Sequence, residues 1–175
     1  IYYLFSAKPK GLEGWPFHEY DHAKRARFFE KRIKQIKDIE WVGGEIIEND
    51  EDILPIKNRL ADVDGLVVIV LTSPSRGLRK LSEMGITTPT LIFNDLFCGD
   101  CGFLGYQQEA SSAGMRLISL SSADIGLLER KIQLLRTAAR LRRSKIICFR
   151  DRGAVNEQLK QAAKDKLGVE IVQMG

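Results

Sequence analysis

The sequence predicts an α/β fold in which a five-stranded parallel sheet is covered by helices on both faces. Leu66–Leu71 is apolar at every position and rich in β-branched residues. A strand with one wet face would alternate, so this run indicates a central strand buried on both faces. Leu91–Phe93 repeats the pattern more briefly after Pro89. Strand-like and helix-like segments alternate along the chain, which indicates parallel strands joined by right-handed crossovers.

The strands are expected where short apolar runs stand between turn residues. We expect five strands in the first part of the chain and two more near its end. The first five are Ile1–Ser6, Trp41–Ile47, Gly65–Thr72, Thr90–Phe93 and Arg116–Leu120, and the last two are Lys145–Phe149 and Val169–Val172.

The helices are expected from amphipathic spacing and from terminal signals. Ala26, Phe29 and Ile33 share one face of the first helix, while Lys and Arg fill the other face. Asp52 is suited to N-cap the second helix, and Pro74 to open the third. The expected helices are His18–Ile39, Asp52–Ala61, Pro74–Met84, Phe103–Ala113, one capped by Ser121-Ser122 that runs to about Arg143, and Val155–Leu167.

Two domains are expected, 1–143 and 144–175. The helix after the fifth strand is about twenty residues long, whereas the other crossovers are nearer ten. This long helix is therefore expected to lead out of the five-stranded unit. Residues 144–175 would open a second α/β unit that is too small to bury a core alone. The chain starts at Ile1 inside an apolar run and ends just after a strand, so we expect a fragment of a longer protein.

The amino-acid composition limits the cellular locations and the binding partners expected for this chain. Hydrophobic residues make up 44% of the 175 residues, and no apolar stretch approaches the eighteen residues of a membrane span. Three cysteines without a signal-peptide pattern favour a reducing, cytoplasmic compartment. We therefore expect no membrane partner.

A basic cluster raises the question of nucleic acid. Between Glu129 and Arg152 there are nine basic residues and two acids, within a net charge of +4 for the chain. The cluster lacks interleaved aromatic residues, and its helix has apolar positions at Leu128, Ile132 and Leu135. A solvated face, or a face covered by further chain, is favoured over a nucleic-acid site.

One motif raises a metal-dependent alternative. His18-Glu19-Tyr20-Asp21-His22 matches H-E-x-x-H, in which two histidines on one helical face bind zinc and the glutamate acts as general base. The motif lies in a polar first turn rather than on a buried helix. A histidine at the edge of the core is therefore favoured for His22, and a zinc hydrolase using His18, Glu19 and His22 remains a rival hypothesis.

Two further motifs follow the third and fourth strands. Cys98-Gly-Asp-Cys101 is a C-x-x-C motif before an expected helix. Its two cysteines could form a redox pair or half of a metal site, and the alternative is that they are reduced thiols in a turn. The glycines at 99, 102 and 105 lack the dinucleotide-binding spacing. Ser73–Arg76, expected at a helix N-terminus, could hold an anion or be a plain cap. Because ligands bind at the carboxyl ends of parallel strands, we expect function at Ser73–Arg76 and Asn94–Gly102.

From Ala61 onward the chain resembles the N-terminal part of the L-fucose/L-arabinose isomerase superfamily, in its fucose isomerase-like branch. The resemblance covers roughly Ala61–Phe149. The segments that carry it are Ala61-Asp-Val-Asp-Gly-Leu-Val-Val, Pro89-Thr-Leu-Ile-Phe, Leu96-Phe-Cys-Gly before a helix, and Leu134-Leu-Arg-Thr-Ala-Ala-Arg-Leu-Arg-Arg-Ser-Lys-Ile-Ile.

The resemblance implies a flavodoxin-like three-layer first domain, a related second domain and a C-terminal β-rich domain. Together with the buried third strand, it implies the sheet order 2-1-3-4-5 for the first domain. Such enzymes interconvert aldoses and ketoses with a divalent metal, usually Mn²⁺, bound in the later domains. It therefore implies that this chain holds no catalytic residue, metal ligand or cofactor, and contributes assembly and sugar contacts. The resemblance also implies that the loop Lys8–His18 contributes residues to the active site of a neighbouring subunit. With the strand ends, the expected substrate-binding residues are Lys10, Trp15, His18, Ser73, Asn94, Asp95 and Cys98.

The alternative to this reading is a non-enzymatic α/β module that binds a small ligand or a partner at the same strand ends. A homo-oligomer is also expected. The last long helix has an apolar face wider than a single contact with the sheet can bury. Three leucines spaced seven residues apart widen it, namely Leu127, Leu134 and Leu141. The terminal strands also offer edges that could pair with a second copy, by exchange of the βαβ unit.

Overall fold

The computed structural model describes all residues except 150–152, 154 and 175. Arg150, Asp151 and Arg152, which belong to the basic cluster, therefore lie outside the described residues. The chain forms two compact units, Ile1–Leu135 and Arg136–Gly175, and the helix α5 (Ile125–Arg142) contributes residues to both.

The first unit is built on the parallel sheet that the sequence predicts. Its strands are β1 (Tyr2–Ser6), β2 (Val42–Ile47), β3 (Leu66–Val70), β4 (Thr90–Asp95) and β5 (Leu117–Ser122). All four pairings are parallel and the order is β2-β1-β3-β4-β5, which confirms the predicted flavodoxin-like topology. The carboxyl ends of the strands therefore meet at one edge of the sheet.

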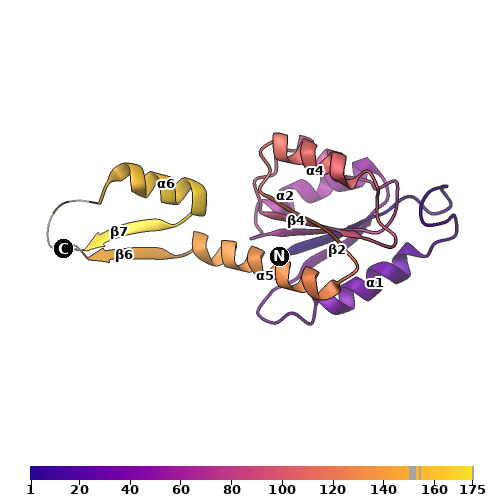
Figure 1. Ribbon diagram of the computed structural model, residues 1–175, viewed down its shortest axis with the longest axis horizontal. Coiled ribbons are helices and arrows are strands. Elements are labelled where there is room, and N and C mark those ends of the chain that lie inside the picture. The colour runs from indigo at the N-terminus through magenta and orange to yellow at the C-terminus, as the bar shows by residue number, and fades with distance from the viewer. Residues whose placement is uncertain (150–152, 154, 175) are drawn as a thin grey trace. The chain divides into compact units, whose positions relative to one another are not determined.

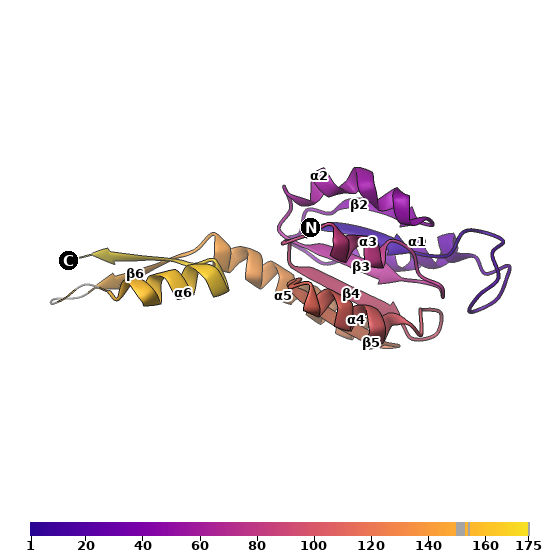
Figure 2. The ribbon, with the colours of Figure 1, turned by 90° about the horizontal axis from the view of Figure 1, so that it is seen from above.

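Helices cover both faces of this sheet (Figures 1 and 2). One face carries α1 (His22–Ile33) and α5, whose Phe29 and Leu128 share a buried cluster with the strands. The other face carries the 3₁₀ helix η1 (Asp50–Ile56), α2 (Lys57–Leu60), α3 (Leu78–Glu83) and α4 (Phe103–Ser112). The core thus lies in two layers, as a three-layer sandwich requires.

The central strand β3 explains why the sequence pattern was informative. Leu66, Val68 and Val70 pack on the η1–α4 side, and the residues between them pack on the α1–α5 side. Every side chain of the strand is completely buried. A strand with two dry faces needs an unbroken apolar run, and this run is what the chain supplies.

Four helices begin later than predicted, and one of them is α6, which starts at Glu157 rather than Val155. Helix α1 starts at His22, because the Asp21 carboxylate caps it by accepting a hydrogen bond from Lys24 N at 2.8 Å. Helix α3 starts at Leu78 rather than Pro74, after Gly77 with a φ of 76° that favours glycine. Ser121-Ser122 does not cap α5 but forms the end of β5.

The second helix begins earlier than predicted, at Asp50. Asn49 occupies the N-cap of η1, and Asp52 stands three residues later. The Asp52 carboxylate reaches back and accepts a hydrogen bond from Asn49 N at 2.9 Å. The prediction that Asp52 is the N-cap is therefore wrong, because an acidic residue can serve a capping box from its third position.

The second unit contains β6 (Lys145–Phe149), α6 (Glu157–Leu167) and β7 (Glu170–Met174). The two strands pair in parallel, with Lys145 opposite Glu170. Helix α6 buries none of its residues, and Phe149 on β6 is 76% exposed. This unit therefore leaves apolar surface uncovered within its own described residues.

Candidate functional site

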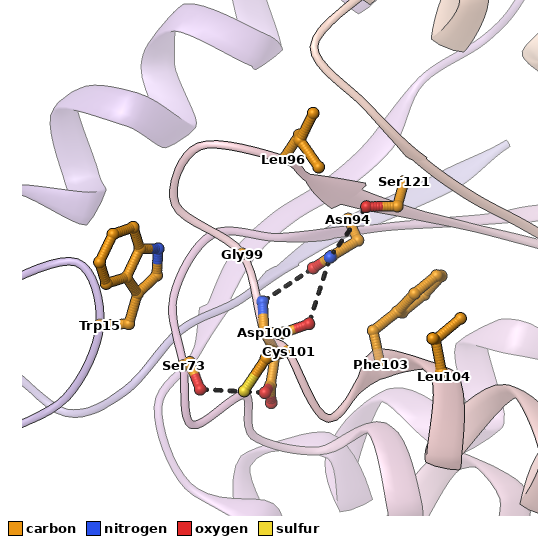
Figure 3. Close-up of a pocket in the computed structure, with 10 residues that line it drawn as sticks. All are labelled: Trp15, Ser73, Asn94, Leu96, Gly99, Asp100, Cys101, Phe103, Leu104 and Ser121. Atoms are coloured by element: carbon orange, nitrogen blue, oxygen red, sulfur yellow. Dashed lines mark hydrogen bonds between the residues drawn. The ribbon is translucent and has the colours of Figure 1, made fainter.

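A cavity of about 480 Å³ lies at the carboxyl ends of β3, β4 and β5 (Figure 3). Its walls come from the loop after β1, from the ends of the three strands and from the start of α4. The lining residues are Trp15, Ser73, Asn94, Leu96, Gly99, Asp100, Cys101, Phe103, Leu104 and Ser121. The cavity thus combines apolar walls with a few polar side chains, as small-molecule sites do.

Asp100 holds two strand-end loops together. Its carboxylate accepts hydrogen bonds from the Ser73 hydroxyl at 3.0 Å and from the Ser75 hydroxyl and amide at 2.6 and 2.8 Å. It also accepts one from Gly102 N at 2.8 Å, just before α4. Burial opposes ionisation of this carboxyl, but these hydrogen bonds prevail and lower its pKa. The anionic form of Asp100 therefore joins the loop after β3 to the loop after β4.

The side-chain amide of Asn94 fixes the backbone of the same turn. Its Oδ1 accepts a hydrogen bond from Asp100 N at 2.8 Å, and its Nδ2 donates to Asp100 O at 3.2 Å. The Nδ2 group also donates to Ser121 Oγ at 3.2 Å on β5. Gly99 passes so close that a Cβ there would lie 2.1 Å from Asn94 Oδ1. The turn therefore needs glycine for close approach.

Trp15 brings the loop after β1 to this cavity. Ser73 N donates to Trp15 O at 3.1 Å, and the indole Nε1 donates to Phe97 O at 3.1 Å. The indole is nevertheless 55% exposed. Its polar edge is held by the loop after β4, so the ring has a fixed position while remaining accessible.

A second polar cluster lies at the end of β4. Asp95 is almost fully buried, and its Oδ2 accepts a hydrogen bond from Arg25 Nε at 2.6 Å. The Arg25 guanidinium lies 4.8 Å from the ring centres of Phe28 and Phe29. Burial opposes its charge, but the bond to Asp95 prevails and raises the Arg25 pKa. The buried carboxylate is thus compensated by a cation from α1.

Tyr20 and Cys98 belong to this second cluster. The buried Tyr20 hydroxyl has no hydrogen-bond partner among the described residues. Burial, followed by the neighbouring Cys98 thiol, raises the pKa of Tyr20. The three cysteines of the chain are all free thiols.

The H-E-x-x-H segment does not form the helical pair that the zinc hypothesis requires. Because α1 begins at His22, His18 lies in the preceding loop and the two histidines do not share a helical face. The His22 ring is buried and its Nε2 lies 2.7 Å from Glu48 Oε1. Among the described residues no three His, Cys, Asp or Glu side chains are grouped to hold a metal ion.

The predicted site residues divide among three places. Trp15, Ser73 and Asn94 line the strand-end cavity. Asp95 and Cys98 belong to the cluster with Arg25 and Tyr20. Lys10 and His18 line a separate cavity of about 490 Å³ beside the start of α1.

Sequence reasoning missed two polar residues of the strand-end cavity. Asp100 lay inside the stretch expected to be functional but was not singled out, and its role depends on contacts with a distant loop. Ser121 was assigned to a helix cap. Had the fifth strand been extended by two residues, Ser121 would have been a strand-end candidate like Ser73 and Asn94.

No helix of the described residues combines the length and the apolar character that a membrane crossing needs. Comparison with protein-family models gives no match for this chain. A search of curated proteins also finds no relative.

Proposed function

We propose that this chain is the N-terminal domain of a sugar-isomerase-like enzyme and that its strand-end cavity contacts the sugar. The observation that carries the proposal is the Trp15 indole, fixed at Nε1 and still exposed, beside the polar groups of Ser73 and Ser121. An aromatic face next to hydroxyl groups suits a sugar ring, which has apolar C–H faces and a polar rim.

The cavity still has hydrogen-bonding capacity for such a ligand. Ser121 Oγ accepts from Asn94 and, among the described residues, has no acceptor for its own proton. Ser73 Oγ donates to Asp100 and keeps its lone pairs. The carboxylate of Asp100 already accepts four hydrogen bonds. We therefore assign ligand contacts to Trp15, Ser73 and Ser121, and a structural role to Asp100.

The proposal assigns no chemical step to this chain. The divalent metal of the enzymes it resembles, usually Mn²⁺, finds no ligand set among the described residues. The role proposed for this chain is to bind and orient a sugar whose aldose–ketose interconversion takes place on other domains. Its three free thiols suit a cytoplasmic compartment.

Calorimetry and NMR titration with monosaccharides, including fucose and arabinose, test the sugar contact. We expect saturable binding with shifts at the Trp15 indole, and at least about tenfold weaker binding in a Trp15→Ala variant. Trp41→Phe is the control, since Trp41 precedes β2 and does not line the cavity. Binding that is unaffected by Trp15→Ala, or no binding of any sugar tested, contradicts the proposal.

The rival is a non-enzymatic module whose strand-end edge binds a protein partner. Leu96, Phe97 and Leu104 favour it, because all three side chains are exposed beside the cavity. Reading the gene beyond the codon of Gly175 separates the two hypotheses. A further reading frame of about 300 residues with Glu, Asp and His ligand candidates supports the isomerase, by ordinary domain sizes. A stop codon close to that position supports the module.

A further inference from the structure

Lys8 is a buried lysine at the carboxyl end of β1. It is 1% exposed and lies next to the point where the sheet order turns from β1 to β3. Among the described residues its ammonium group has no carboxylate within ion-pair distance. A buried cation without an anionic partner is costly, and an apolar residue would be the cheaper choice for a core position. The ammonium group therefore needs a structural or functional reason.

The contacts of Lys8 Nζ supply that reason. Nζ donates to Gly14 O at 2.9 Å and to Phe17 O at 3.0 Å. These two carbonyl groups flank the dipeptide Trp15-Pro16 on either side. One ammonium group thus holds both ends of the short segment that presents the Trp15 indole.

The backbone of Lys8 is fixed to the neighbouring strand. Lys8 N donates to Thr72 Oγ1 at 2.6 Å, and Thr72 is completely buried. Ser73, the next residue, donates its amide to Trp15 O at 3.1 Å. Lys8 therefore links the end of β1, the end of β3 and the Trp15 segment through three hydrogen bonds of its own.

We propose that Lys8 is the positioning residue of the sugar site: its ammonium group holds the Trp15 segment in the conformation that binds ligand. This inference rests on the proposed function for the identity of the ligand, but not for the positioning itself. Preorganisation of this kind raises affinity because the loop is already ordered when the ligand arrives. The exposed part of the Trp15 ring is then the surface that contacts the ligand, and the ring is held in place before the ligand binds.

The test uses a single-tryptophan protein. The chain contains two tryptophans, so a Trp41→Phe background leaves Trp15 as the only fluorophore of its kind. Lys8→Met keeps an unbranched side chain, one atom shorter, and removes the ammonium group. Ile53→Val, in the completely buried core of η1, serves as the control for general loss of stability. Hydrogen exchange of the Trp15 indole N–H and time-resolved anisotropy of its fluorescence report on the order of the segment without any ligand.

Lys8→Met removes both hydrogen bonds of Nζ, to Gly14 O and Phe17 O, so we expect exchange of the indole N–H to become at least about tenfold faster. The nanosecond anisotropy decay should gain a fast component, and sugar affinity should fall about tenfold. Ile53→Val should lower the thermal midpoint and leave all three readouts unchanged. Unchanged indole exchange and anisotropy in a folded Lys8→Met protein would overturn the inference.

The outcomes also separate this inference from the proposed function. If Lys8→Met loosens Trp15 but no sugar binds the parent protein, the positioning role stands and the sugar site fails. If sugar binds and Lys8→Met changes nothing, the sugar site stands and the positioning role fails. Should Lys8→Met not fold, ¹⁵N detection of the Lys8 ammonium in the unmodified protein decides. Slow exchange of its protons supports the inference, and exchange as fast as that of the surface lysines overturns it.

Discussion

The Asp100→Asn variant tests whether the anionic carboxylate joins the two strand-end loops. The substitution keeps the shape of the side chain but leaves one oxygen where there were two. With the amide nitrogen in the place of Oδ2, Ser75 N loses its acceptor, and the Ser75 hydroxyl must turn to accept a hydrogen bond instead of donating one. Hydrogen bonds to a charged group contribute about 1.5–3 kcal/mol each, and an unpaired buried amide costs about as much. Since Asp100 is partly exposed, we expect a net loss of about 2 kcal/mol.

Urea and thermal unfolding followed by circular dichroism measure this loss. About 2 kcal/mol corresponds to a thermal midpoint lower by about 8 °C in a unit of this size. Asp62→Asn is the matched control, because Asp62 is an exposed carboxylate. A loss below about 0.5 kcal/mol, or one equal to that of the control, would refute the reasoning about Asp100.

The pH dependence gives an independent check with a defined sign. The pKa of Asp100 is lowered from its usual 3.8, so the folded protein binds a proton less readily than the unfolded chain. The stabilisation is therefore fully present above the unfolded pKa and is lost as the pH falls through the folded value. The difference between the parent protein and Asp100→Asn should be constant from about pH 6 to 8 and shrink below about pH 4. A difference that does not change with pH contradicts an ionised Asp100.

Two further predictions concern the turn and the assembly. Gly99→Ala should destabilise the fold by about 1–3 kcal/mol in urea unfolding, because the new methyl group would overlap the Asn94 amide. Gly105→Ala, in helix α4 with nothing within 4 Å, should not destabilise and should gain up to about 1 kcal/mol. In light scattering at micromolar concentration we expect a mass above the 19.8 kDa of one chain, falling in a Leu134→Glu variant, since Leu134 is 46% exposed. A mass of 19.8 kDa for the parent protein would refute self-association.

The fold could be predicted from the sequence because its central strands bury both faces. A strand buried on both faces must be apolar at every position, as Leu66–Leu71 is. The crossover rules then leave few arrangements of five parallel strands. Helix starts were harder to predict, because they depend on competing local signals. Pro74 is a good first helical residue, yet α3 begins only after Gly77. Nothing in the local pattern distinguishes a proline that opens a helix from one in the preceding loop.

The site could be predicted only as far as it follows from the sheet. Ser73 and Asn94 lie at the cavity because they end parallel strands, and that rule needs no long-range information. Asp100 is different, because its partners Ser73 and Ser75 are 27 and 25 residues away in the sequence. Lys8 was overlooked for a related reason. A lysine in a polar loop is normally exposed, and its burial becomes visible only once the carbonyls of Gly14 and Phe17 are in place.

Taken together, the hydrogen bonds at the carboxyl edge separate the residues that hold the site from those free to bind. The polar groups of three residues form hydrogen bonds with backbone and hydroxyl groups of the protein itself, and these residues are Asn94, Asp100 and Lys8. Trp15 and Ser121 are held by such bonds and still present a ring face and a hydroxyl proton. A variant of a holding residue should therefore lower stability and affinity together, whereas a variant of a binding residue should lower affinity alone. Comparing the two losses across Asp100→Asn and Trp15→Ala distinguishes a preorganised binding site from a loop edge that is merely well packed.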